Sequence, residues 1–184
     1  MASTKSGASG APGATTMVAV APHLGLERVL RQSATSVTAL LEQLVGEPVD
    51  AHARRHVMTR AGTPNLLEVE EGHRLLRRSA VLEGRRSARP YMHAESLLVP
   101  SRLPDSFCRR LENSSDPIGR IFAEEGVGFT RSPLPCPDRP RAGDWPVPDD
   151  YLLSRTYRVD VDDVPVMVIT EWFLPALELF LGPC

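Results

Sequence analysis

The sequence lacks an apolar segment long enough to cross a membrane. Its longest uninterrupted apolar runs, at residues 17–22 and 164–169, are only a handful of residues long, whereas a transmembrane helix needs about 20. Residues 1–16 contain one lysine and no apolar core, so no secretory signal is recognisable. We therefore expect a cytoplasmic protein that does not associate with membranes.

Cysteine and lysine are both scarce. The three cysteines, Cys108, Cys136 and Cys184, show no C-x-x-C spacing, which is typical neither of a disulfide framework nor of a thiolate metal site. We expect free thiols in a reducing compartment. Lys5 is the only lysine among 21 basic residues. Arginine suits recognition of carboxylates by paired hydrogen bonds, although codon usage produces the same bias.

There is no excess of basic residues either. The formal net charge is -2 and the sequence pI is about 6.2, whereas a surface that binds nucleic acid usually carries a clear positive excess. We therefore expect a small-molecule ligand and no nucleic-acid partner. The length of 184 residues fits one ordinary domain.

Composition divides the chain into three kinds of segment. Residues 1–22 are rich in Ser, Gly, Ala and Thr and are predicted to be a disordered leader, because they can bury little apolar surface. Residues 23–184 are predicted to form a single domain. Within it, residues 132–150 are rich in proline, which removes backbone donors and opposes regular pairing. This stretch is predicted to be a loop or a lid over a site.

Local patterns predict helices and strands in an order typical of an α+β fold. Helices are expected at residues 25–32, 36–45 and 104–111, and from Asp116 as N-cap with Pro117 in the first turn to Gly126. Thr35 or Ser36 is expected to cap the second helix, and Gly46 to end it. Strands are expected at residues 49–59, 75–82, 91–99, 154–161 and 164–173. Direct hairpins at residues 83–89 and 162–163 favour an antiparallel sheet with helices packed on one face.

Two charged residues stand out on the apolar faces of these predicted strands. Glu171 shares a strand face with Ile169 and Phe173, and a carboxylate in such a place needs a partner or a proton. It is a candidate for proton transfer or hydrogen bonding to a ligand; a glutamate at a strand end that faces water or a structural arginine is the alternative. Arg78 faces the same way as Leu82 and could bind a carboxylate or form a structural ion pair.

Other candidates are weaker. The amides of Val37 and Ile118 follow predicted helix starts, where unpaired N–H groups attract anions, but most helix starts meet only water or a cap. His52 and His56 have the spacing of a helical zinc site, yet their segment is predicted to be a strand and lacks the glutamate of H-E-x-x-H. No metal site is therefore expected. His93 could line a pocket or be an ordinary buried histidine.

Five short segments occur in an order that is similar to a known family. They are T-S-V-T at 35–38, R-S-A-V-L-E-G at 78–84, A-E-S-L at 94–97 with R-L-P at 102–104, D-P-I-G-R at 116–120, and T-E-W-F-L at 170–174. With these segments, residues 24–181 resemble the chorismate pyruvate-lyase (4-hydroxybenzoate synthase) family. The resemblance implies a six-stranded antiparallel sheet, helices on one face and a buried ligand cavity, with no metal or organic cofactor.

The resemblance also implies an activity and a site. The activity is that of a carbon–oxygen lyase, which eliminates pyruvate from chorismate to give 4-hydroxybenzoate in a biosynthetic pathway. Arg78 and Glu171 match the catalytic positions, and Val37 and Ile118 match the backbone amides that contact the anionic substrate. By the same resemblance, residues that match or neighbour family motifs, namely Ala94, Glu95 and Arg131, are predicted to bind the substrate.

One stretch departs from the family pattern. Members of this branch usually carry an acidic E-T-x-R/K-E-like strand, whereas residues 126–133 keep only Thr130 and Arg131 of that pattern. Two other functions therefore stay open. The fold could serve as a non-catalytic domain that binds an aromatic or carboxylate ligand, as in bacterial transcription regulators that look like this fold, or as a dehydratase or cyclase for another carboxylate.

Overall fold

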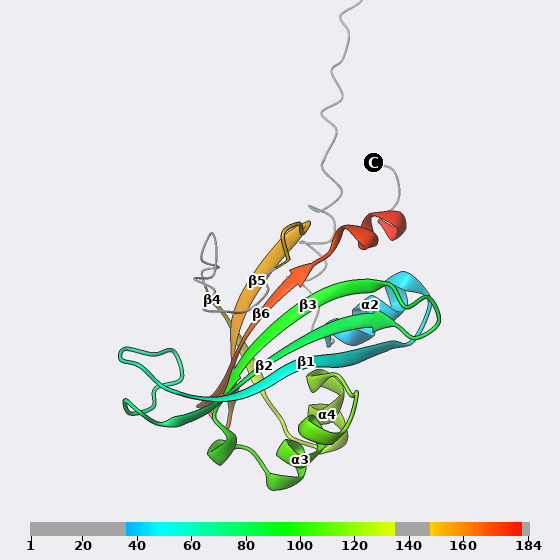
Figure 1. Ribbon diagram of the computed structural model, residues 1–184. Helices are drawn as coiled ribbons and strands as arrows, with labels where there is room; N and C mark the ends of the chain where they lie inside the picture. Colours follow the sequence, from blue (N-terminus) through cyan, green and yellow to red (C-terminus); the bar gives the residue numbers. More distant parts are fainter. Residues whose placement is uncertain (1–35, 135–147, 182–184) are drawn as a thin grey trace, which may run out of the picture.

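Six strands form a single antiparallel sheet, shown in Figure 1. The computed structural model describes residues 36–134 and 148–181. The strands are β1 (Val49–Arg60), β2 (Arg74–Gly84), β3 (Pro90–Leu98), β4 (Thr130–Leu134), β5 (Leu153–Val161) and β6 (Val164–Phe173). Their order across the sheet is β1-β2-β3-β6-β5-β4. The predicted α+β class with six antiparallel strands is confirmed.

Among the described residues, three α-helices pack on one face of this sheet. They are α2 (Val37–Val45), α3 (Asp105–Asn113) and α4 (Ile118–Glu124), with short 3-10 helices at Pro100–Arg102 and Pro175–Phe180. One core cluster joins Phe107 and Phe122 of α3 and α4 to Met167 of β6, and another joins Leu41 of α2 to Leu82 of β2. The apolar side chains of the sheet that meet the helices alternate along the strands, as expected for one covered face.

Local sequence signals set the ends of several elements. Ser36 caps α2 by accepting a hydrogen bond from the Ala39 amide at 3.2 Å, and Gly46 ends the helix with a φ of 70°. Asp162 and Asp163 form the turn between β5 and β6, with φ values of 49° and 61°. Two consecutive positive φ values are the mark of a type I′ turn, whose twist matches that of the paired strands.

The start of α4 differs from the sequence-based prediction by one residue. Pro117, with a ψ of 143°, is the N-cap, so it lies outside the helix, and α4 begins at Ile118. Asp116 does not cap the helix as predicted. Its carboxylate instead accepts hydrogen bonds from Arg110 on α3, at 2.8 Å and 3.0 Å. The D-P-I-G-R segment thus ties the start of α4 to the preceding helix.

The prediction of an irregular stretch at residues 132–150 is wrong at its first residues. Residues 130–134 form β4, which pairs with β5 through Ser132 opposite Arg158 and Pro133 opposite Tyr157. β4 is the last strand of the sheet, and an edge strand tolerates a proline because one side of it needs no partner. Residues 135–147 of the predicted lid, the predicted leader and the predicted helix at 25–32 lie outside the described residues.

β1 contains one irregularity that matters for the site. Its register against β2 shifts between Ala53 and Arg55, so β1 has one residue more than β2 in this region. Such a bulge reverses which side chains face the helices on its far side. As a result, one odd and one even position of β1 face the helices. Ala51 lies opposite Leu82, and His56 lies opposite Arg78, both of which are on the covered face of β2.

Arg102, from the R-L-P segment that follows β3, forms hydrogen bonds to the loop before β2 and to the start of β6. Its guanidinium donates to the carbonyls of Leu67, Glu68 and Pro165 at 2.7, 3.1 and 2.6 Å. A planar group with several donors can bridge three carbonyls in this way. In the described ranges, no helix is long and apolar enough to span a membrane.

Candidate functional site

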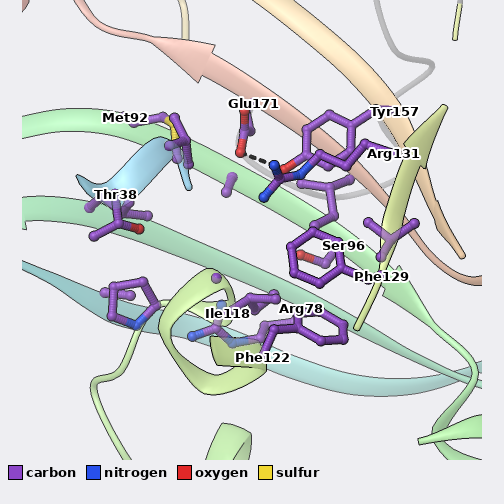
Figure 2. A pocket seen from close by; sticks show the side chains of 18 residues that line it. Thr38, Arg78, Met92, Ser96, Ile118, Phe122, Phe129, Arg131, Tyr157 and Glu171 are labelled. Carbon is purple, nitrogen blue, oxygen red and sulfur yellow. Dashed lines mark hydrogen bonds between the residues drawn. The ribbon is translucent and has the colours of Figure 1, made fainter. Parts of the chain in front are cut away.

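A pocket lies between the covered face of the sheet and the first turns of α2 and α4 (Figure 2). The space outside its atoms, including the part open to solvent, is about 520 Å³, a size suited to a small ligand. Most of the predicted site residues line it, namely Val37, Arg78, Ala94, Ile118, Arg131 and Glu171. The fold therefore brings together residues from six elements that are separated in the sequence.

The two helix starts meet at a glycine. A Cβ atom on Gly119 would lie 2.9 Å from the Cβ of Ser36, closer than such atoms approach in proteins. Glycine is therefore required for α4 to begin beside the N-cap of α2. The first amides of a helix have no partner within it. Because Val37 and Ile118 both line the pocket, this contact directs two positive helix ends toward the same space.

Arg78 is the buried cation of the pocket. It is 2% exposed, and burial lowers the pKa of its guanidinium to about 10, which still leaves it charged at neutral pH. Its Nε donates to Nε2 of His56 at 3.1 Å, while its Nη2 is buried without a hydrogen-bond partner in the described structure. A buried donor without a partner is costly, so this nitrogen is available to donate a hydrogen bond to an anionic ligand.

Glu171 lies on the other side of the pocket, as Figure 2 shows, and is also 2% exposed. Arg155 donates to its Oε2 at 2.6 Å and the Tyr157 hydroxyl to its Oε1 at 2.8 Å. The carboxylate therefore has the partners that its burial demands, and each oxygen still has a lone pair for a ligand. Burial, and next the charge of Glu171, raise the pKa of Tyr157 well above its usual value, so the tyrosine stays a donor.

Arg78 and Glu171 are separated by one strand. β3 lies between β2 and β6, and Ser96 of β3 is opposite Arg78 whereas Ala94 is opposite Glu171. Two strand spacings and an offset of two residues along the strands place the two charged residues roughly 12 Å apart at the backbone. The Ser96 hydroxyl is buried between them with no partner among the described residues. The floor of the pocket thus offers a cation, a hydroxyl and a carboxylate in a row.

Arg131 supplies a second cation from the edge strand β4. Its guanidinium carbon lies 4.7 Å from the centre of the Phe129 ring and 5.6 Å from that of the Tyr157 ring, a cation–π arrangement that holds it flat against the wall. Its Nε is buried without a partner in the described part of the chain. Residues 126–133 depart from the family pattern but keep Arg131, which agrees with the position of this arginine in the pocket.

Glu95, the remaining predicted site residue, lies outside the pocket. Successive side chains of a strand point to opposite faces, and Ala94 and Ser96 occupy the pocket face of β3. Glu95 therefore points to the other face, where it forms an ion pair with Arg77. His93 also faces that side and hydrogen-bonds to Ser79 at 2.9 Å. Glu95, unlike the other predicted site residues, is therefore not brought into this pocket.

The histidine pair of β1 has no metal-binding arrangement. His52 lies 3.9 Å from Glu83 and is 49% exposed at its side chain, whereas His56 bonds to Arg78. Nowhere in residues 36–134 and 148–181 do three His, Cys, Asp or Glu side chains gather around one point. The segment is a strand, as predicted.

Sequence analysis missed three contributors to the site. Tyr157 and Arg155 donate hydrogen bonds to Glu171 and lie on the same face of β5. The alternation of that predicted strand could have indicated that both side chains point the same way. His56 was considered only as a metal ligand. Its link to Arg78 depends on the register of β1 against β2, which no local pattern reveals.

Comparison with curated proteins gives chorismate pyruvate-lyases as sequence relatives. No family model matches the chain. A chorismate pyruvate-lyase of Mycobacterium tuberculosis (strain CDC 1551 / Oshkosh) is 32% identical over 110 residues, which cover 55% of this chain and 53% of that protein. The chain thus matches only about half the length of this curated relative.

Solved structures resemble the chain at the level of the fold. The crystal structure of PhnF from Mycobacterium smegmatis has a TM-score of 0.51 and 15% identity, and the match covers 79% of this chain and 66% of that one. A GntR-family transcriptional regulator from Bacillus cereus has a TM-score of 0.43 and 12% identity, with 70% and 92% covered. The sequence resemblance of this chain to chorismate pyruvate-lyases is therefore confirmed over about half of its length, and its α+β fold with an antiparallel sheet is shared with the PhnF structure.

Proposed function

We propose that this chain is a chorismate lyase-type enzyme that eliminates pyruvate from chorismate to give 4-hydroxybenzoate. The observation that carries the proposal is the buried, partly unpartnered guanidinium of Arg78 in one pocket with the carboxylate of Glu171. The sequence relatives named chorismate pyruvate-lyase support the same activity.

The reaction fits the chemistry of the pocket. The ring of chorismate loses a proton from the carbon that carries its hydroxyl, and the C–O bond on the neighbouring carbon breaks with its electron pair going to the oxygen. The departing enolpyruvyl group and the proton together make pyruvate, and the ring becomes aromatic. Because the substrate supplies every atom and electron, the protein has mainly to bind, orient and exclude water.

Each pocket residue then has a role. Arg78 and the helix starts bind one carboxylate of the substrate, and Arg131 binds the other, which fixes the ring between them. Glu171, already bonded to Arg155 and Tyr157, is an acceptor and takes a hydrogen bond from the ring hydroxyl. This hydrogen bond holds the hydroxyl-bearing carbon, which loses its proton, in a fixed orientation in the pocket. A general acid or base contributes roughly 100- to 10,000-fold to such a step.

The test is direct. Purified protein is incubated with chorismate, and 4-hydroxybenzoate and pyruvate are measured by chromatography for the wild type, Arg78→Gln and Glu171→Gln. We expect equimolar products from the wild type and a loss of roughly 10- to 100-fold or more in both variants. Arg77→Gln and Glu95→Gln are matched controls, since both residues belong to the ion pair on the opposite face, and should stay active.

Two results would refute the proposal. If the wild type forms no product while chorismate or 4-hydroxybenzoate raises its melting temperature, the pocket binds a carboxylate without turnover, which is the second function considered from the sequence. If the products form equally fast in the Arg78 and Glu171 variants, the chemistry takes place elsewhere.

A further inference from the structure

The contact between Arg78 and His56 has no role in the function proposed so far. Nε of Arg78 donates to Nε2 of His56 at 3.1 Å, and the two residues are direct cross-strand partners. The same guanidinium has its Nη2 buried without a partner in the part of the chain that the structure describes. One edge of the guanidinium is therefore held by His56, while another is left for a ligand.

This geometry fixes the protonation state of His56. Arginine only donates hydrogen bonds, so Nε2 of the histidine must accept, and the single ring proton lies on Nδ1. We propose that His56 is a positioning residue that holds the Arg78 guanidinium toward the pocket, and that protonation of His56 weakens carboxylate binding there. The inference rests on the proposed function for the identity of the ligand and deepens it.

The electrostatics around His56 favour the neutral form. Burial lowers its pKa below the usual value, the positive charge of Arg78 lowers it further, and only Glu112 on α3 acts in the opposite direction. At neutral pH the acceptor is thus in place. As the pH falls below the ordinary histidine value of about 6.5, the ring gains a proton, and two donors with like charges face each other across the former hydrogen bond.

The direction of the pH effect separates positioning from simple charge. A protonated His56 adds one positive charge beside the pocket, and charge alone would tighten binding of an anion at acid pH. Loss of the hydrogen bond, in contrast, lets the Arg78 side chain turn away from the ligand and weakens binding. Carboxylate ligands stay ionised above about pH 5, so the range from pH 5.5 to 8 reports on the protein.

The experiment measures the dissociation constant of 4-hydroxybenzoate by calorimetry from pH 5.5 to 8 for the wild type, His56→Gln and His56→Leu. We expect the affinity of the wild type to fall several-fold toward pH 5.5. Glutamine keeps an acceptor but does not titrate, so His56→Gln should retain the neutral-pH affinity within about three-fold and lose the pH dependence. Leucine removes the acceptor and should weaken binding roughly 10-fold at every pH.

A matched control is available on the same strand. His52 is an exposed histidine of β1 next to Glu83, and His52→Gln should leave the pH profile of binding unchanged. In parallel, nitrogen NMR of the wild type at pH 7 should show Nε2 of His56 unprotonated and Nδ1 protonated. This measurement needs no ligand and no variant that must fold.

The outcomes are distinct. An affinity that rises toward acid pH, a pH dependence that survives in His56→Gln, or a protonated Nε2 at pH 7 would overturn the positioning role. Binding that weakens at low pH without any pyruvate release would refute the lyase but keep the role of His56. Pyruvate release with binding that does not depend on pH would do the reverse, and a wild type that binds no carboxylate would overturn both.

Discussion

Gly119 is the point at which the two helix starts of the pocket depend on each other. The Cβ of Gly119→Ala would lie 2.9 Å from the Cβ of Ser36 and 3.7 Å from its Oγ. Carbon atoms are normally in contact at about 3.5 to 4.0 Å, so the two atoms must separate by roughly 0.6 Å or more. The Ser36 Cβ is attached directly to the backbone, and rotation of its side chain cannot relieve the contact. The start of α2 or α4 must move.

The magnitude follows from two opposing effects. Overpacking of this kind costs about 1 to 3 kcal/mol, whereas alanine in a helix normally gains up to about 1 kcal/mol over glycine. We expect Gly119→Ala to lower the free energy of unfolding by about 1 to 2 kcal/mol, or the melting temperature by about 2 to 8 °C for a protein of this size. Displacement of a binding group by about 1 Å can cost roughly 100-fold in activity. We therefore expect chorismate turnover to fall by up to about 100-fold in a variant that still folds.

Urea unfolding and chorismate turnover check this prediction. The double variant Ser36→Gly/Gly119→Ala removes the clashing Cβ, and glycine at an N-cap costs only a few tenths of a kcal/mol relative to serine, so most of the stability and activity should return. Gly62→Ala is the matched control, because nothing lies within 4 Å of its added Cβ. Wild-type stability and turnover in Gly119→Ala, or no recovery in the double variant, would refute the reasoning.

Three further predictions concern stability. Hydrogen bonds, above all the one from the Ser87 hydroxyl, lower the pKa of Glu47 to about 2. The stability that they contribute is complete above about pH 4.5 and is lost as the pH falls toward 2. Glu47→Gln should therefore flatten the decline of stability in acid unfolding curves, and an unchanged slope would contradict this prediction. Asp163→Gly should raise the free energy of unfolding by roughly 0.5 kcal/mol, because Asp-Gly is the preferred pair for a type I′ turn; a loss in urea unfolding would speak against it. Arg102→Lys should cost about 1 to 3 kcal/mol in the same assay, since one ammonium cannot serve three carbonyls, and wild-type stability would show that these bonds contribute nothing.

The fold was predictable where local signals and tertiary packing agree. The five longer strands carry β-branched residues and alternation, and the cap at Ser36 and the stop at Gly46 follow from the conformations that these residues favour. β4 was not predicted, because Pro133 opposes a strand unless the strand lies at an edge. Whether a strand is at an edge depends on the order of the whole sheet, which a local pattern does not contain.

The site was predictable to the extent that it follows strand faces. Arg78 and Glu171 were found because each is a charge on an apolar face, and the resemblance to the family places them in one site. Glu95 was assigned to the site because its segment matches the family, whereas the alternation of β3, with Ala94 on the pocket face, places Glu95 on the other face. The partners of Glu171, and His56 beside Arg78, come from strands that are adjacent only in the folded sheet.

The bulge in β1 is a place where the strand can lose one residue without losing its pairing with β2. Between the partners Leu82 and Arg78, β2 advances four positions, from 82 to 78, while β1 advances five, from 51 to 56. Deleting one residue in the middle of β1 would give both strands four positions between these partners, so the bulge would disappear and β1 would pair regularly with β2. An even count leaves Ala51 and His56 on the same face of the strand, so His56 would stay opposite Arg78 and a single deletion at the bulge would keep the contact between them.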